Sequence, residues 1–254
     1  MSPDLLHIAG IALVLATAGF IQGLTGFGFA IVGMAFLPVI TPDWESSMTL
    51  VAVNSILIPF VLLKRHGGEF SLRPALGLTI GTLVGTYLGF HFMKQNMEGG
   101  WFIRLFGGVL IAFSIFDLIQ STRKGAVFSI HRALAIPFGF AGGFFGGAFN
   151  IGGPPVVAYA YSQGWSKSQI IATLQVVFLF GAGYRMLLMG SHGFFNQSVF
   201  HLLIWTTPAT LLGIVTGNHF LARTDQAQLR TWVFVLVGIL GLYYLIRGTA
   251  VPVS

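Results

Sequence analysis

The chain has 254 residues, of which 55% are hydrophobic and 8% are charged, and it contains no cysteine. Soluble domains carry about 25% charged residues. This composition, with a mean hydropathy of +0.83, therefore predicts a polytopic membrane protein. The lack of cysteine excludes disulfides and zinc–thiolate sites. The net charge of +6 is explained by Lys and Arg held in cytoplasmic loops, so it does not call for nucleic acid as a partner.

Apolar segments predict the same order of helices in each half of the chain. Residues 5–22 form a long arm, a glycine-rich break covers 23–28, and a short arm covers 29–40. Spans follow at 46–63, 72–93 and 101–120. The second half has arms at 131–148 and 156–161 around its own break, then spans at 168–189, 199–221 and 229–246. Residues 163–166 end the second short arm, and Ser166 could cap the next helix.

Glycine and proline interrupt the apolar sequence at the second break. Proline has no amide hydrogen, and each glycine costs about 1 kcal/mol relative to alanine in a helix interior. A helix that enters residues 142–155 therefore cannot continue through Pro154 and Pro155. Broken helices within a membrane often form the substrate sites of transporters.

The two breaks predict an internal repeat. Residues 19–28 align with 139–148 at an offset of 120, while Trp44 and Trp165, like Asn54 and Gln175, are 121 positions apart. We interpret this as two modules, 1–124 and 125–254, within a single transmembrane domain. Chance alignment of glycine-rich apolar sequence is the alternative.

The distribution of Lys and Arg predicts that each broken segment returns to its starting side. If each segment returns, nine Lys and Arg residues lie on one side of the membrane and three on the other. If each segment crosses once, the numbers are seven and five. The nine are Lys64, Arg65, Arg73, Arg123, Lys124, Arg132, Lys167, Arg223 and Arg230, and the three are Lys94, Arg104 and Arg247. The positive-inside rule favours a segment that returns, as a re-entrant hairpin or as two short crossings, and the short second arms favour the hairpin because a span needs about 20 residues. The expected fold is all-α: two inverted repeats, each a broken hairpin plus three transmembrane helices, with both termini extracytoplasmic.

Polar residues and glycines at the breaks and mid-span are the candidate substrate ligands. They are Gln22, Thr25, Gly26, Asn54, Gly146, Gly147, Asn150, Gly152, Gly153 and Gln175. The N-terminus of a half-helix presents free N–H groups and a positive dipole end, which suits an anion. The alternative is that the glycines allow close packing and the amide side chains bond neighbouring helices. Arg185 either snorkels towards the interface or supplies a counter-charge.

Catalytic and metal-binding patterns are not found in the sequence. The seven Asp and Glu residues, Asp117 among them, are expected in loops or near helix ends, and the seven histidines are scattered without a His-x-x-x-His motif. We therefore predict no enzyme activity, no metal and no cofactor. A membrane-embedded enzyme is the weaker hypothesis.

The stretches from Gly19 and from Gly142 resemble the paired signatures of the sulfite exporter TauE/SafE family. The first reads GFIQGLTGFGFA and the second GGFFGGAFNIGGPP, and the duplication extends the resemblance over nearly the whole chain. The resemblance implies a bacterial inner-membrane carrier of a small anion such as sulfite or an organosulfonate. A channel-like or scaffold protein without coupled transport is the alternative. The expected partners are this anion and the bilayer, and a homodimer is among the oligomeric states that the sequence allows.

Overall fold

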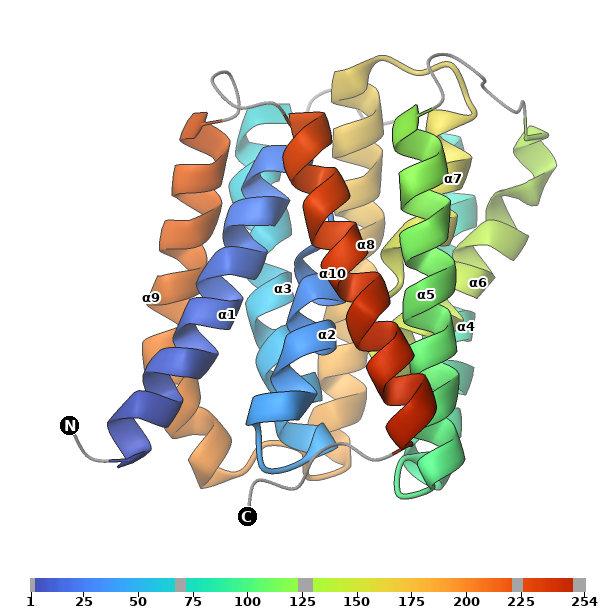
Figure 1. The fold of residues 1–254 in the computed structure, drawn as a ribbon. Helices are drawn as coiled ribbons and strands as arrows, with labels where there is room; N and C mark the ends of the chain where they lie inside the picture. The colour runs from blue at the N-terminus through green and yellow to red at the C-terminus, as the bar shows by residue number, and fades with distance from the viewer. Residues whose placement is uncertain (1–2, 67–71, 123–129, 221–225, 249–254) are drawn as a thin grey trace. The chain divides into compact units, whose positions relative to one another are not determined.

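The computed structural model describes residues 3–66, 72–122, 130–220 and 226–248 (Figure 1). These residues contain helices and no strand. In the first half the helices are α1 (Pro3–Thr25), α2 (Phe29–Ile40), α3 (Trp44–His66), α4 (Leu72–Asn96) and α5 (Gly100–Thr122). In the second half they are the 3-10 turn η2 (Arg132–Leu134), α6 (Ala135–Phe149), α7 (Gly153–Tyr161), α8 (Lys167–Ser191), α9 (Gln197–Phe220) and α10 (Gln226–Arg247). The all-α prediction is confirmed.

The predicted helix boundaries lie within four residues of those in the structure, and the larger differences include the arms around the breaks: α1 continues to Thr25 rather than residue 22, and α6 begins at Ala135 rather than residue 131. The short arm predicted at 29–40 is α2 at both ends, and the side chain of Ser166 caps α8 in a capping box with Gln169. Helix α7, however, begins at Gly153 and not at residue 156. Pro154 and Pro155 fit into its first turn, because the N–H groups there have no partner within the helix.

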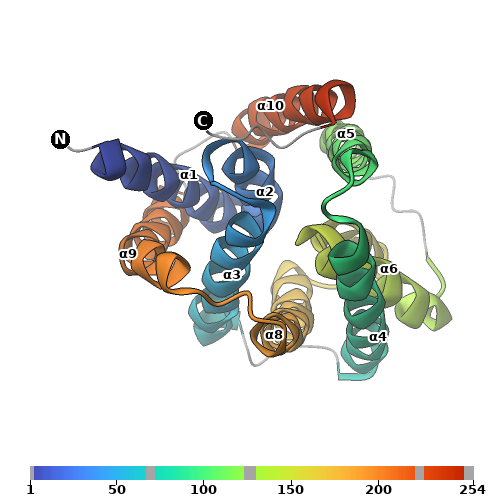
Figure 2. The ribbon, with the colours of Figure 1, turned by 90° about the horizontal axis from the view of Figure 1, so that it is seen from below.

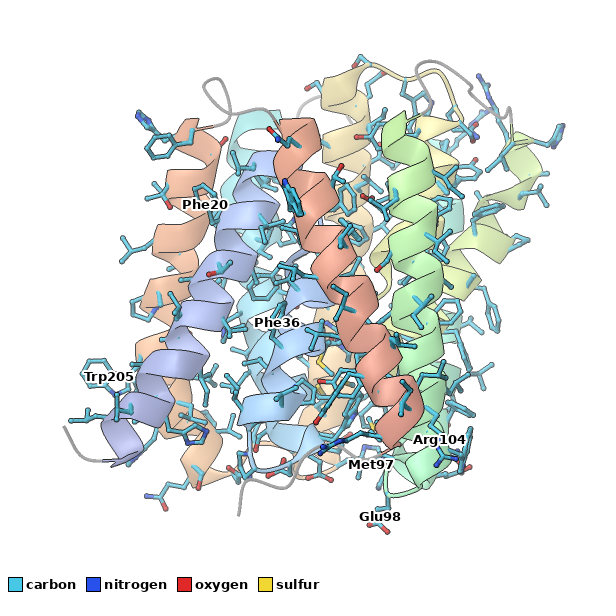
Figure 3. All side chains as sticks on the ribbon, in the orientation of Figure 1. Phe20, Phe36, Met97, Glu98, Arg104 and Trp205 are labelled. Atoms are coloured by element: carbon cyan, nitrogen blue, oxygen red, sulfur yellow. The ribbon has the colours of Figure 1, made fainter. Side chains whose placement is uncertain are left out.

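The outward surface of the long helices is apolar. By length and composition, six of the described helices could cross a membrane: α1, α3, α4, α5, α8 and α9. Leu13, Leu187 and Leu212 are 68%, 71% and 66% exposed, and Trp205 points outward from α9 (Figure 3). Large exposed apolar surfaces are rare on soluble monomers but normal where lipid covers them. The prediction of a multi-pass membrane protein is confirmed.

The chain divides into two compact units. Unit 1 comprises Met1–Asn54, Asn96–Arg123 and Gly193–Ser254, and unit 2 comprises Ser55–Gln95 and Lys124–His192. Each unit therefore takes helices from both halves of the sequence. The assignment of modules to residues 1–124 and 125–254 stays a prediction.

Within unit 1, the closest helix pairing is that of α1 with α9. The two helices lie side by side (Figure 1), and Phe20 lies between their upper parts (Figure 3). Gly213 and Gly217 lie against the carbonyls of Ala16 and Phe20 in α1, so that a Cβ on either glycine would collide with the backbone of that helix. Such glycine contacts let membrane helices approach closely. Helix α5 pairs in the same unit with α10.

Within unit 2, α4 lies beside α6 (Figure 2). Gly81, Gly85 and Gly89 of α4 lie against the backbone of α6, and the side-chain hydroxyl of Thr82 donates a hydrogen bond of 3.2 Å to the carbonyl of Gly139. This packing fixes the helix that leads into the second break.

Each broken segment returns to the end of its unit from which it started. The ring of His7, near the start of α1, hydrogen-bonds the carbonyl of Ile40 at the end of α2. In unit 2 the hydroxyl of Tyr159, near the end of α7, donates to the carbonyl of Arg132 ahead of α6, at 3.1 Å. Both segments are therefore hairpins, as the charge distribution predicted.

The start of α1 and the end of α10 lie at the same end of unit 1 (Figure 1). Trp44, which follows α2, packs edge-on against Phe102 at the start of α5. Arg104 of α5 contacts Gly248, directly after α10. The two ends of the described chain therefore lie on one side of the unit, and the extracytoplasmic placement of both termini stays a prediction.

Candidate functional site

The first break, between α1 and α2 in unit 1, is closed by the side chain of Gln22. Its Nε2 donates to the carbonyl of Gly26 at 2.9 Å, and its Oε1 accepts a hydrogen bond of 3.0 Å from the N–H of Phe29. Gln22 is 4% exposed. The buried amide thus bridges the end of one helix and the first N–H of the next, so both of its polar atoms are used within the break.

The residues of the first break support its tight backbone. Gly26 and Gly28 have φ values of 82° and 107°, which favour glycine. The hydroxyl of Thr25 donates to the carbonyl of Ile21 at 2.9 Å, within its own helix. These contacts give Gln22, Thr25 and Gly26 a role in shaping the break.

The second break, between α6 and α7 in unit 2, is built differently. Helix α6 ends at Phe149, and Asn150 adopts the left-handed conformation with φ 64° and is 1% exposed. Its N–H donates to the carbonyl of Gly146, and the N–H of Ile151 donates to that of Phe145, at 3.0 and 3.2 Å. This pattern terminates a helix, and asparagine tolerates it better than most residues.

The N-terminus of α7 follows without a side-chain cap. Among the described residues, the N–H groups of Gly152 and Gly153 donate no hydrogen bond, and Pro154 and Pro155 have none to donate. The space around Gly153 is open, since a Cβ placed there would meet no atom within 4 Å. Two backbone donors are therefore left at the positive end of α7.

Arg185 of α8 extends to this second break. Its Nη1 donates to the carbonyl of Gly146 at 3.0 Å, and its Nη2 lies 3.4 Å from the hydroxyl of Ser55, which belongs to α3. Its side chain is 6% exposed, and its Nε is buried without a partner. The guanidinium group is therefore buried against the end of α6, and the role of Arg185 as a counter-charge stays a prediction.

The charge of Arg185 has no counter-ion within the part of the chain that the structure describes. Its hydrogen-bond acceptors are a carbonyl and a hydroxyl, and no carboxylate is paired with it. Burying a charge is costly unless it is paired. The site is therefore electrostatically suited to a bound anion.

The break glycines divide into packing residues and residues at the site. Gly147 lies against the backbone of α4 at Thr86, so helix packing accounts for it. The Cα of Gly152 lies 3.5 Å from the position that a Cβ on Gly146 would take, and Arg185 Nη1 lies 3.7 Å from that position. Gly146, Gly152 and Arg185 are thus brought together.

Asn54 and Gln175, the predicted mid-span pair, are both buried. Asn54 is fully buried in unit 1; its Nδ2 donates to the carbonyl of Leu50, and its Oδ1 has no partner among the described residues. Gln175 is 1% exposed in unit 2, on the same helix as Arg185 and ten residues before it, which is about 15 Å along the axis. That these amides share one polar centre stays a prediction.

Two features of the structure were not predicted from the sequence. Ser55 was not singled out, because a serine next to Asn54 carries no distinctive pattern. Asp117 lies near the end of α5 as expected, but its side chain is only 4% exposed. Among the described residues no group of three or more His, Cys, Asp or Glu is placed to hold a metal ion.

Comparison with known proteins identifies the family. The family model described as sulfite exporter TauE/SafE matches residues 11–244. The chain belongs to this family. A TauE/SafE relative from Cupriavidus necator, named "Probable sulfite/organosulfonate exporter TauE", is 25% identical over 248 residues, covering 92% of this chain and 93% of the relative. No solved structure matches the chain. The predicted resemblance is confirmed.

Proposed function

We propose that this TauE/SafE protein is a secondary transporter that moves a small anion, sulfite or an organosulfonate, across the bacterial inner membrane. The family and the name of the Cupriavidus relative support anion transport. The fold supports it too, because broken hairpins with free helix termini are a common way to build a transporter site.

The observation that carries the proposal is the buried, unpaired charge of Arg185. A charged side chain within a membrane helix is costly, and such residues usually pair with another group or line a polar cavity. The two neutral hydrogen-bond acceptors of Arg185 do not neutralise its charge. An anion bound beside the guanidinium would offset this cost, which gives the residue a purpose that helix packing does not provide.

The N-terminus of α7 would complete the anion site. The N–H groups of Gly152 and Gly153 can donate to an oxyanion, and the helix dipole adds to the positive potential of Arg185. Charge-assisted hydrogen bonds of this type are about twice as strong as neutral ones. Asn150 and Gln175, also in unit 2, are the further polar candidates.

The transport cycle would use the two hairpins as inverted repeats. Both termini would face away from the cytoplasm, as the distribution of Lys and Arg suggests. The N–H groups at the start of α7 would then be reached alternately from the two sides of the membrane. A channel or scaffold would not show this alternation.

The experiment is anion binding and counterflow with purified protein. We expect sulfite and methanesulfonate to raise the melting temperature in detergent, and labelled sulfite to exchange into proteoliposomes preloaded with unlabelled sulfite. Arg185→Gln should abolish both effects. Arg104→Gln, at an exposed arginine of α5, is the matched control and should behave as the wild type. Binding without counterflow would favour a channel, and no response to any small anion would refute the proposal.

A further inference from the structure

The two hairpins correspond in structure at an offset of 124 residues. Helices α1 and α6 end at Thr25 and Phe149, which are 124 positions apart. Helices α2 and α7 begin at Phe29 and Gly153, which are also 124 positions apart. The alignment from sequence alone, at 120, differs from this register by four residues, or about one helical turn.

Glycine contacts support the same register. Gly19 and Gly23 of α1 lie against the carbonyls of Thr210 and Ile214 in α9. Their counterparts at an offset of 124, Gly143 and Gly147 of α6, lie against the carbonyls of Thr82 and Thr86 in α4. The residues whose carbonyls face these glycines keep a constant spacing too. Thr82 and Thr210 are 128 positions apart, and so are Thr86 and Ile214. Each unit thus repeats the same close pairing between a hairpin and a helix from the other half of the chain.

At this register the counterpart of Gln22 is Gly146. In the first break, Gln22 fills the space between the two helices and accepts the hydrogen bond from Phe29. In the second break, Gly146 has no side chain, and the Nη1 of Arg185 lies 3.7 Å from where its Cβ would be. A neutral amide on the hairpin itself is thus replaced by a cation that comes from α8.

We infer that Gly146 determines where the anion binds: its missing side chain admits the guanidinium of Arg185, so the second break holds the anion and the first does not. This inference rests on the proposed function and deepens it. In the first break, the side chain of Gln22 fills the space between the two helices and accepts the hydrogen bond of the first N–H of α2, that of Phe29. In the second, the space holds a cation, and the leading N–H groups of α7 donate to no described residue.

The geometry of Arg185 also indicates the chemical class of the ligand. Its Nη1 is engaged by Gly146, and its Nε is buried without a partner. Nη2 lies 3.4 Å from the hydroxyl of Ser55, and its second N–H, beside the Nε–H, would complete a parallel pair of donors that matches a ligand with two oxygens on one atom. The anion is therefore an oxyanion such as a sulfite or a sulfonate, and a halide, with one acceptor atom, should bind more weakly.

The test substitutes the two break residues one at a time and measures sulfite affinity by calorimetry in detergent. Gly146→Gln gives the second break the side chain of the first, and we expect it to weaken sulfite binding by about tenfold or more, comparable with the loss of one charge-assisted contact. Gln22→Ala should lower the melting temperature and keep sulfite affinity within about threefold. Gly183→Ala, on α8 where a Cβ would have its nearest neighbour at 4.0 Å, is the control for a glycine substitution and should change neither property.

A second variant allows for a Gly146→Gln protein that does not fold. The double variant Gly146→Gln, Arg185→Leu removes the guanidinium that the new side chain would meet, so it should fold, and it should not bind sulfite. Gly146→Ala, whose Cβ would have only ordinary contacts, should fold and bind. If Gln22→Ala abolishes binding, or if either Gly146→Gln variant binds as the wild type does, the inference is overturned. If the wild type binds no oxyanion, the proposed function itself fails.

Discussion

Gly23 of α1 lies directly against the carbonyl oxygen of Ile214 in α9, and a Cβ on this glycine would come within 3.0 Å of that oxygen and of the N–H of Asn218. Gly23→Ala should therefore separate the two helices and destabilise the protein by about 1–3 kcal/mol, as overpacking does in other cores. The measurement is the melting temperature in detergent.

The control for this substitution lies on the same helix. Gly10 of α1 has no neighbour within 4 Å of the Cβ position. Gly10→Ala should be neutral or stabilising, because alanine is favoured over glycine in a helix by about 1 kcal/mol. Equal melting temperatures for the Gly10 and Gly23 variants would contradict the packing role of Gly23.

Tyr244 of α10 provides a test of how the first hairpin is held. Its hydroxyl donates a hydrogen bond of 2.9 Å to the carbonyl of Ala35 in α2, and its side chain is fully buried. Tyr244→Phe should cost about 0.6 kcal/mol, the average for interhelical bonds in membranes, and up to about 1.7 kcal/mol. Tyr243→Phe is the matched control. Denaturant titration would measure the free energy of unfolding of both variants. A smaller loss of stability for Tyr244→Phe than for Tyr243→Phe would refute this role.

The helices of this protein could be predicted largely from local sequence. Helix α2 was predicted at both ends because Gly28 precedes it and Thr41–Pro42 follow it, and both are strong local signals. The start of α7 was predicted three residues late because Pro154 and Pro155 were interpreted as part of the break. Proline disrupts a helix interior but fits a first turn, and sequence alone did not distinguish these cases.

The sequence predicted a repeat at an offset of 120, four residues from the register at which the ends of the two hairpins correspond. Glycines recur every four residues in both hairpins, at Gly19 and Gly23 and at Gly139, Gly143 and Gly147. A shift of four residues therefore aligns glycine with glycine equally well. Only the helix ends and the contacts of each glycine distinguish an offset of 124 from one of 120.

The burial of Arg185 could not be predicted for a related reason. One of its partners is the backbone carbonyl of Gly146, which leaves no residue-type signal in the sequence, and the other is the hydroxyl of Ser55, a serine without a distinctive pattern. By contrast, Gln22 was identified as a polar residue at a break, although its use in closing that break depends on the N–H of Phe29 seven residues later.

Membrane topology can be mapped by cysteine labelling, because the chain has no native cysteine. Single cysteines placed in residues 64–73, 121–132 and 222–230 should react from the cytoplasmic side, since these segments contain most of the Lys and Arg. Cysteines at either terminus should react from the opposite side. Labelling of the two termini from different sides would refute the inverted arrangement.

Asn54 offers a test that separates function from packing. It is fully buried in α3, its Nδ2 donates only to the carbonyl of Leu50 in the same helix, and its Oδ1 has no partner among the described residues. A buried amide oxygen without a donor is unfavourable, by about 1–3 kcal/mol. Asn54→Leu removes that oxygen and breaks no bond between helices, so the melting temperature should stay close to that of the wild type. If Asn54 serves transport, sulfite counterflow into proteoliposomes should be lost. Val53→Leu, the neighbouring control, should leave both properties unchanged. An Asn54→Leu protein that transports normally would show that this amide takes no part in the transport site.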